Sequence, residues 1–287
     1  MAFAAPTLAS NKTPSAAPLL EVGGYPARVC RIIDLGLQPG SAKYPDPQLK
    51  LLVTFELLEE FMKEVDANGN MIMVQDPDED EGVMMAKNLE DKPRWFDFEF
   101  SYNADGYMGD NSHIKKFAVA IDALEVPANP EQGIAGHAAK ELKDWLTEPL
   151  IVGLSTYTKS SGKNAGQIAN KITTFSSMKS KEKKVAKPLV NPTVFFDMSA
   201  PDLEVFNKLP GGDSPYAIKN RITNGVKFNE TALFALLGGK PVDTSTPNQA
   251  TDEQVDAALQ AELAAQQKAR EEAAANNEEG KPAGMPF

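Results

Sequence analysis

The sequence has little cysteine and histidine, and it has no long apolar run. Its one cysteine, Cys30, excludes an internal disulfide framework and a zinc site built from several cysteines. No stretch of about 18 apolar residues occurs, so no membrane-spanning helix is predicted. The start of the chain has no basic region before Phe3, which argues against a secretory signal peptide. We therefore expect a cytoplasmic protein.

Motifs of catalysis and phosphate binding are also missing. The two histidines, His113 and His137, fall on predicted helices, and no set with a serine or cysteine nucleophile can be assembled around them. The pair Gly162-Lys163 has neither the following Ser or Thr nor the earlier glycine of a P-loop. We therefore expect no enzyme activity and no cofactor.

The formal net charge of −11 is unevenly distributed. Segment 59–91 carries eleven acidic residues against two lysines, and segment 240–287 carries nine against four basic residues, which leaves +3 for the remainder. A binding field depends on the charge within a Debye length, about 8 Å at physiological salt. An anionic total therefore does not exclude a nucleic-acid partner for the mildly basic body.

The acidic segment has the beginning of a calcium-binding pattern. Asp76, Asp78 and Asp80 alternate as in a calcium loop, but Glu81 and Lys87 stand where an EF-hand needs its glycine and its last acidic ligand. We therefore expect a solvated acidic loop and no metal site.

Alternating apolar residues predict the strands of the fold. Phe96, Phe98 and Phe100 alternate with polar residues and are expected to face the core. An Asn68-Gly69 pair between short apolar runs predicts a β-hairpin within the acidic segment. The predicted strands lie at residues 23–36, 49–60, 94–102, 148–159 and 170–178.

Helical periodicity follows the third strand. It predicts a helix over 111–124, capped by Asn111 or Ser112, and a second helical piece over 136–146. Two short helices are expected over 200–222, around a Pro-Gly-Gly break. Three strands, a helical connection and a two-strand hairpin follow one another in the order of an OB-fold.

These elements predict a mainly β protein with helices. We expect a five-stranded OB-fold barrel in a domain at 23–239, with the acidic hairpin insertion at 59–91 and a helical extension at 200–239. A flexible arm at 1–22 precedes this domain, and a disordered acidic, alanine-rich tail at 240–287 follows it.

Basic and aromatic residues gather on the two loops that flank the binding face of an OB-fold. Cations can follow phosphates while rings stack on bases, each stack being worth roughly 1–3 kcal/mol. Taken singly, these side chains fit ordinary half-buried aromatics and solubilising lysines, but their joint placement on both loops favours single-strand binding. The predicted DNA-binding residues are Arg28, Arg31, Lys43, Tyr44, Lys50, Arg94, Trp95, Tyr157, Lys159, Lys163 and Lys171.

Two features of the sequence each allow two interpretations. Trp95 either stacks on bases beside Arg94 or lies partly buried under the acidic hairpin, since Asp97 and Glu99 on its face would repel phosphate. The run at 179–187, KSKEKKVAK, either grips the DNA backbone or serves as a basic connector.

Four stretches carry a family resemblance: GGYPARVCRIIDLGLQ, LVTFELLEE, NSHIKKFAVAI and FNKLPGGDSPYAIKNRI. They resemble the single-stranded DNA-binding proteins of tailed phages over residues 23–225. The resemblance implies an OB-fold that coats single strands during replication or recombination in the host cytoplasm. The long acidic segment 59–91 and the extra Gly-Gly-Asp after Leu209-Pro210 depart from that pattern.

The chain ends on Pro286 and Phe287, after an acidic run. Such an end is either an accident of a solvated terminus or a hook similar to the tail tip of bacterial single-stranded DNA-binding proteins. The resemblance implies that Phe287 enters an apolar pocket of a replication or recombination protein, with its carboxylate captured by a basic residue. The contiguous aspartates of the bacterial tip are absent here.

Two other functions compete with DNA binding. One is a structural or adaptor OB module that acts through protein contacts only. The weaker one is a metal-dependent nuclease that uses Asp78 and Asp80.

Overall fold

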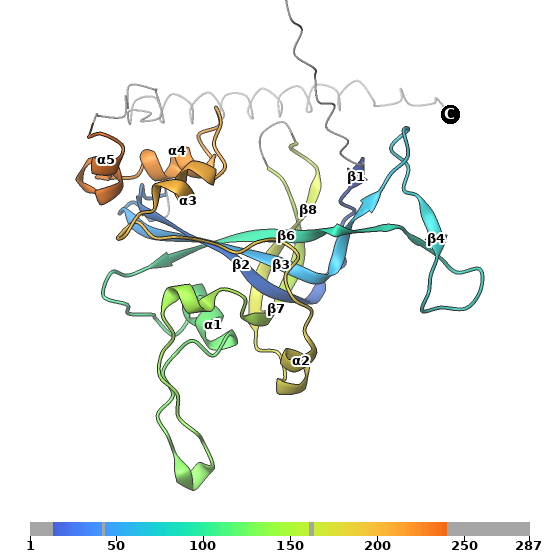
Figure 1. The fold of residues 1–287 in the computed structure, drawn as a ribbon, viewed down its shortest axis with the longest axis horizontal. Helices are drawn as coiled ribbons and strands as arrows, with labels where there is room; N and C mark the ends of the chain where they lie inside the picture. Colours follow the sequence, from blue (N-terminus) through green and yellow to red (C-terminus); the bar gives the residue numbers. More distant parts are fainter. Residues whose placement is uncertain (1–13, 42–43, 161–163, 240–287) are drawn as a thin grey trace, which may run out of the picture. The chain divides into compact units, whose positions relative to one another are not determined.

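The computed structural model of the protein describes residues 14–41, 44–160 and 164–239. It is mainly β, with one large sheet and a few short helices (Figure 1). Neighbouring strands in this sheet follow the order β1-β3-β2-β7-β8, while β6 pairs with β3 and β9 pairs with β2. The strands are β1 (Ser15–Ala16), β2 (Gly23–Gln38), β3 (Gln48–Glu64), β6 (Asn88–Tyr102), β7 (Pro149–Thr158), β8 (Ile168–Ser176) and β9 (Val194–Phe196).

Strands β2, β3 and β6 form an antiparallel meander whose inner face is apolar. Val53, Phe55 and Phe100 point into this core, while Phe96 and Phe98 pack against it, as their alternation predicted. A bulge at Cys30 inserts one extra residue into β2. Side chains three positions apart in a regular strand face opposite sides, so the bulge is what keeps residues 28 and 31 on one face.

Helix α1 (His113–Ala120) packs into this core through Ile114, Phe117 and Ala118. Ser112 caps it by accepting a hydrogen bond from the Lys115 amide, which confirms the predicted helix start. The Phe117 ring lies 5.2 Å from that of Phe55 and 5.4 Å from that of Trp145. These edge-on contacts join the helix to strand β3 and to the 3-10 turn that contains Trp145.

The predicted helical piece at 136–146 is wrong except for one 3-10 turn, Leu142–Trp145. His137 instead forms an isolated antiparallel bridge with Val126. A Cβ on Gly136 would lie 2.4 Å from the Ala128 amide nitrogen, so the two backbones approach closely here. The isolated bridge binds this stretch to a neighbouring backbone segment and keeps it extended.

The hairpin β7–β8 forms as predicted, and β7 pairs with β2. The large sheet does not close, because no hydrogen-bonded ladder joins β6 to β8 among the described residues. Instead the Phe175 ring of β8 lies 5.1 Å from the Phe98 ring of β6. Asn170 exchanges hydrogen bonds with the backbone of Leu20, and the Arg94 guanidinium donates to the Pro18 carbonyl.

The N-terminal residues 14–22 therefore belong to the folded body, in contrast to the flexible arm expected there. Their short strand β1 pairs with residues 63 and 64 of β3, and the Leu20 side chain is buried in the core. The earlier residues of the predicted arm lie outside the described part of the chain.

A second apolar core joins three short helices to the outer face of the sheet (Figure 1). Ile33 and Leu52 supply the sheet side of this core. The predicted pair of helices around Pro-Gly-Gly is confirmed. The helices are α3 (Leu203–Lys208), α4 (Ile218–Thr223) and α5 (Ala232–Leu236), and 3-10 turns lie at Pro130–Gln132 and Phe228–Glu230.

The acidic segment forms a separate two-stranded ribbon, β4 (Met73–Gln75) and β5 (Met84–Ala86). Before it, the Asn68-Gly69 pair makes the expected tight turn, with Gly69 at φ 85° and the Asp66 carboxylate accepting from the Asn68 amide. None of the described helices is long and apolar enough to span a membrane. The predicted tail at 240–287 lies outside the described residues.

Candidate nucleic-acid interface

The clearest candidate site lies on the outer face of β6, where Trp95 is 53% exposed. The Arg31 guanidinium carbon stands 5.7 Å from the centre of the Trp95 ring, within cation–π range. Arg31 also donates to Thr54 Oγ1 at 2.8 Å and to Asp97 Oδ1 at 3.1 Å. About half of the Trp95 side chain is thus open to solvent, and the contacts of Arg31 hold a cation beside its ring.

The carboxylates beside Trp95 are paired with basic side chains. Asp97 pairs with Arg31, and Glu99 pairs with both Lys50, at 3.6 Å, and Arg221 of α4. The three cations exceed the two carboxylates by one charge. The repulsion of phosphate expected from Asp97 and Glu99 is therefore offset locally.

These side chains form a line that we call the β6 track, consisting of Trp95, Asp97, Glu99 and Ser101. They alternate along one strand and so share one face. At about 3.4 Å per residue, the line extends about 20 Å from Trp95 to Ser101. Lys50 lies beside its end, donating to Ser101 Oγ at 2.8 Å. The track thus runs from the exposed Trp95 ring to Ser101, beside which Lys50 forms its ion pair with Glu99.

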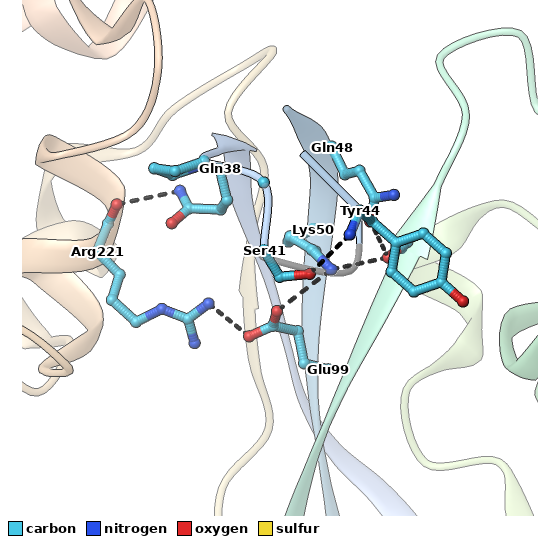
Figure 2. A pocket seen from close by; sticks show the side chains of 10 residues that line it. Gln38, Ser41, Tyr44, Gln48, Lys50, Glu99 and Arg221 are labelled. Atoms are coloured by element: carbon cyan, nitrogen blue, oxygen red, sulfur yellow. Dashed lines mark hydrogen bonds and ion pairs between the residues drawn. The ribbon is translucent and has the colours of Figure 1, made fainter. Parts of the chain in front are cut away.

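A cavity of about 450 Å³ opens at the end of the track, between the β2–β3 loop and α4 (Figure 2). Figure 2 shows Glu99 between Lys50 and Arg221, with the Tyr44 ring on the opposite rim. Amide and hydroxyl groups supply hydrogen-bond donors and acceptors in the cavity. Its lining residues are Gln38, Pro39, Gly40, Ser41, Tyr44, Gln48, Lys50, Glu99, Ser101 and Arg221.

The hairpin β7–β8 carries a second exposed aromatic–cation pair. Tyr157 is 40% exposed, and Lys171 Nζ lies 5.5 Å from the centre of its ring. Lys159 follows directly after the end of β7 and is half-buried. In Figure 1 this hairpin projects on the side of the sheet where α3, α4 and α5 lie.

Two of the predicted DNA-binding residues have structural partners instead. Arg28 donates to three backbone carbonyls, those of Thr147, Ala186 and Lys187. Arg94 is buried, donates to a carbonyl of the N-terminal segment, and has its pKa lowered by that burial. Both guanidinium groups are thus engaged by backbone carbonyls.

Four predicted binding residues lie outside the described part of the chain: Lys43, Lys163, Pro286 and Phe287. Conversely, sequence reasoning missed Arg221 and the amides Gln38 and Gln48. The basic end of the Tyr-Ala-Ile-Lys-Asn-Arg-Ile run could have drawn notice to Arg221. No local signal shows that its helix docks beside Glu99.

Among the described residues, no group of three His, Cys, Asp or Glu side chains is placed to hold a metal ion. No protein-family model matches the chain, and neither a curated protein nor a solved structure shows significant similarity to it. The functional assignment therefore depends on the geometry of the site.

Proposed function

We propose that the protein binds single-stranded DNA with little sequence preference, coating it during phage replication or recombination. The exposed Trp95 ring with Arg31 against it is the observation that carries the proposal. An exposed ring can stack on any base, and neighbouring cations can follow the backbone without reading its sequence. The β6 track, its terminal cavity and the Tyr157–Lys171 pair offer both kinds of contact.

The proposal includes an OB-fold. Its support is the strand order β6-β3-β2-β7-β8, which contains an antiparallel meander and a hairpin that returns to the first strand of the meander. In this interpretation β6 and β8 are the two strands that would close a barrel. Their edges meet through phenylalanine rings and the N-terminal residues 18–20.

The β6 track differs from a simple OB binding face because the C-terminal segment covers part of that face. Residues 186–191 lie over Glu56, and α3 to α5 cover Ile33 and Leu52. We infer that the single strand of DNA follows β6 and enters the cavity beside Lys50. Partner recruitment through Pro286 and Phe287 remains part of the same proposal.

The test is the affinity of the full chain for labelled oligo-dT, measured by fluorescence anisotropy in a series of salt concentrations. Trp95→Ala should weaken binding by roughly 5- to 150-fold, the equivalent of one lost stack of about 1–3 kcal/mol. Lys171→Gln should reduce the slope of log K against log salt by about 0.7, the value for one phosphate contact on a single strand. Tyr107→Ala and Lys143→Gln are matched controls outside the track.

The competing functions give different results in the same assay. An adaptor module would show no salt-dependent binding of oligo-dT or duplex. A nuclease would degrade the oligonucleotide in magnesium and lose this activity in Asp78→Asn/Asp80→Asn. Equal affinity of Trp95→Ala and Tyr107→Ala would refute the assignment of the site.

A further inference from the structure

The ribbon β4–β5 has one uncovered apolar face. Register pairs Met73 with Ala86 and Gln75 with Met84, so Met73 and Met84 lie on the same side of the ribbon. Their side chains are 49% and 51% exposed, and nearby Val83 is exposed as well. Methionine surfaces adapt to varied partners and are common at binding faces. About half of each methionine side chain is therefore open to solvent.

The turn that joins the two strands of the ribbon is strongly acidic. Residues 71–86 include five acidic side chains and no basic one. The carboxylates fall between residues 76 and 81, directly beyond Met73 and before Met84. A partner for the apolar face must therefore present an apolar residue surrounded by cations.

Such a surface exists elsewhere on this chain, on helix α2 (Ser180–Val185). Val185 is 81% exposed, a high value for an aliphatic side chain. The run 179–187 around it contains five lysines and one glutamate. Lys183 forms an ion pair with Asp122, and Lys179 forms one with Glu182. Lys181 and Lys184 have no ion-pair partner among the described residues. In size and charge this helix complements the ribbon.

The two surfaces lie at different places on one molecule (Figure 1). The ribbon extends from the far end of β3 and β6, whereas α2 lies near α1, to which Lys183 and Asp122 connect it. Contact between them within one molecule would need the ribbon to cross the domain. Contact between two molecules joins unlike surfaces and leaves one free surface at each end.

We propose that the acidic ribbon β4–β5 of one molecule docks on helix α2 of a second copy, in a head-to-tail contact. Met73 and Met84 pack against Val185, and the carboxylates at 76–81 face Lys181 and Lys184. Six helical residues span only about 9 Å, so the contact is smaller than a standard interface of about 800 Å² per partner. Self-association is therefore weak and falls with salt. This proposal does not depend on DNA binding.

The experiment is sedimentation velocity of the full chain without DNA, at increasing protein concentration in low and high salt. The weight-average sedimentation coefficient should rise with concentration in low salt only. Lys181→Glu/Lys184→Glu in α2, or Asp78→Lys/Asp80→Lys in the ribbon, should each lower the association constant at least tenfold. Lys143→Glu/Lys208→Glu, which changes the charge equally on other exposed lysines, should leave it within twofold.

Mixing the two reversed variants gives the decisive result. The first keeps an intact ribbon and the second an intact α2, so the mixture should associate under conditions in which each variant alone stays monomeric. Circular dichroism of each variant establishes that it is folded. A wild-type chain that stays monomeric in low salt overturns the proposal. So does loss of association in the α2 variant alone, which would assign another acidic segment to α2, or a mixture that fails to associate.

Discussion

Glu56 should be the most sensitive polar position in the fold. It lies on β3, is 1% exposed, and accepts hydrogen bonds from the amides of Val190 at 2.7 Å and Asn191 at 3.0 Å. The Asn191 side-chain amide donates a third, at 2.6 Å. Arg28, its cross-strand neighbour, binds the carbonyls of residues 186 and 187. Together the two side chains fix segment 186–191 to the sheet.

The cost of Glu56→Ala follows from this count. A hydrogen bond to a charged group contributes about 1.5–3 kcal/mol, but bonds that share one acceptor do not add independently. Removal of Glu56 leaves three neutral amide donors without their acceptor, and a buried donor left unpaired costs about 1–3 kcal/mol. We therefore expect the free energy of unfolding to fall by about 3–5 kcal/mol in the alanine variant. Glu56→Gln should lose about 1–2 kcal/mol, because its oxygen still accepts while its NH₂ faces a donor.

Urea denaturation measures the difference. With a slope of about 2 kcal/mol per molar urea, the alanine variant should unfold about 1.5–2.5 M earlier than the wild type. Hydrogen exchange should show faster exchange of the Val190 and Asn191 amides. Glu59→Ala, on the exposed part of the same strand, should stay within about 0.5 kcal/mol. A Glu56→Ala midpoint equal to that of Glu59→Ala would refute the role of this carboxylate as an anchor.

Two further predictions concern buried titratable groups. Burial raises the pKa of the Asp34 carboxyl, so this carboxyl stays protonated to a higher pH in the folded protein than in the unfolded chain. The free energy of unfolding therefore falls as the pH rises from about 4, the pKa in the unfolded chain, through the pKa in the folded protein. Asp34→Asn can still accept from Tyr102 and Gly36 and should gain stability relative to the wild type over that window in denaturation curves; a constant difference contradicts this. Burial raises the pKa of the Cys30 thiol to about 12. A thiol reagent at pH 8 should therefore label Cys30 only at the rate at which the protein unfolds. Rapid labelling of the native protein would show that the Cys30 thiol is not buried.

Periodicity predicted the elements that bury a single face. The strands of the meander, helix α1 and hairpin β7–β8 each combine an apolar face with a polar one, and their positions follow from that pattern. The prediction of a helix at residues 136–146 was wrong because Leu142 and Trp145 pack through one 3-10 turn and do not form a longer apolar stripe. The bulge at Cys30 has no signal in the sequence, although it places Arg31 beside Trp95.

The candidate site was predicted in part, for a related reason. Tyr44, Lys50 and the Tyr157–Lys171 pair could be found because basic and aromatic residues cluster on two loops. Arg28 and Arg94 are also basic, as the predicted binding residues are, but their guanidinium groups donate to backbone carbonyls from segments more than 70 residues away in the sequence. The burial of a side chain by a remote segment is a property of packing, which local pattern does not encode.

The charge of the track depends on packing in the same way. In the sequence, Asp97 and Glu99 beside Trp95 argue against a phosphate-binding surface. In the folded protein, the second core docks α4 on the outer face through Ile218 and Ile222, and this brings Arg221 to Glu99. Arg221 and Lys50 then share one carboxylate, so the cavity rim keeps a positive balance. The C-terminal helices thus narrow the exposed face and, by the same contact, make the remaining strip compatible with a nucleic-acid backbone.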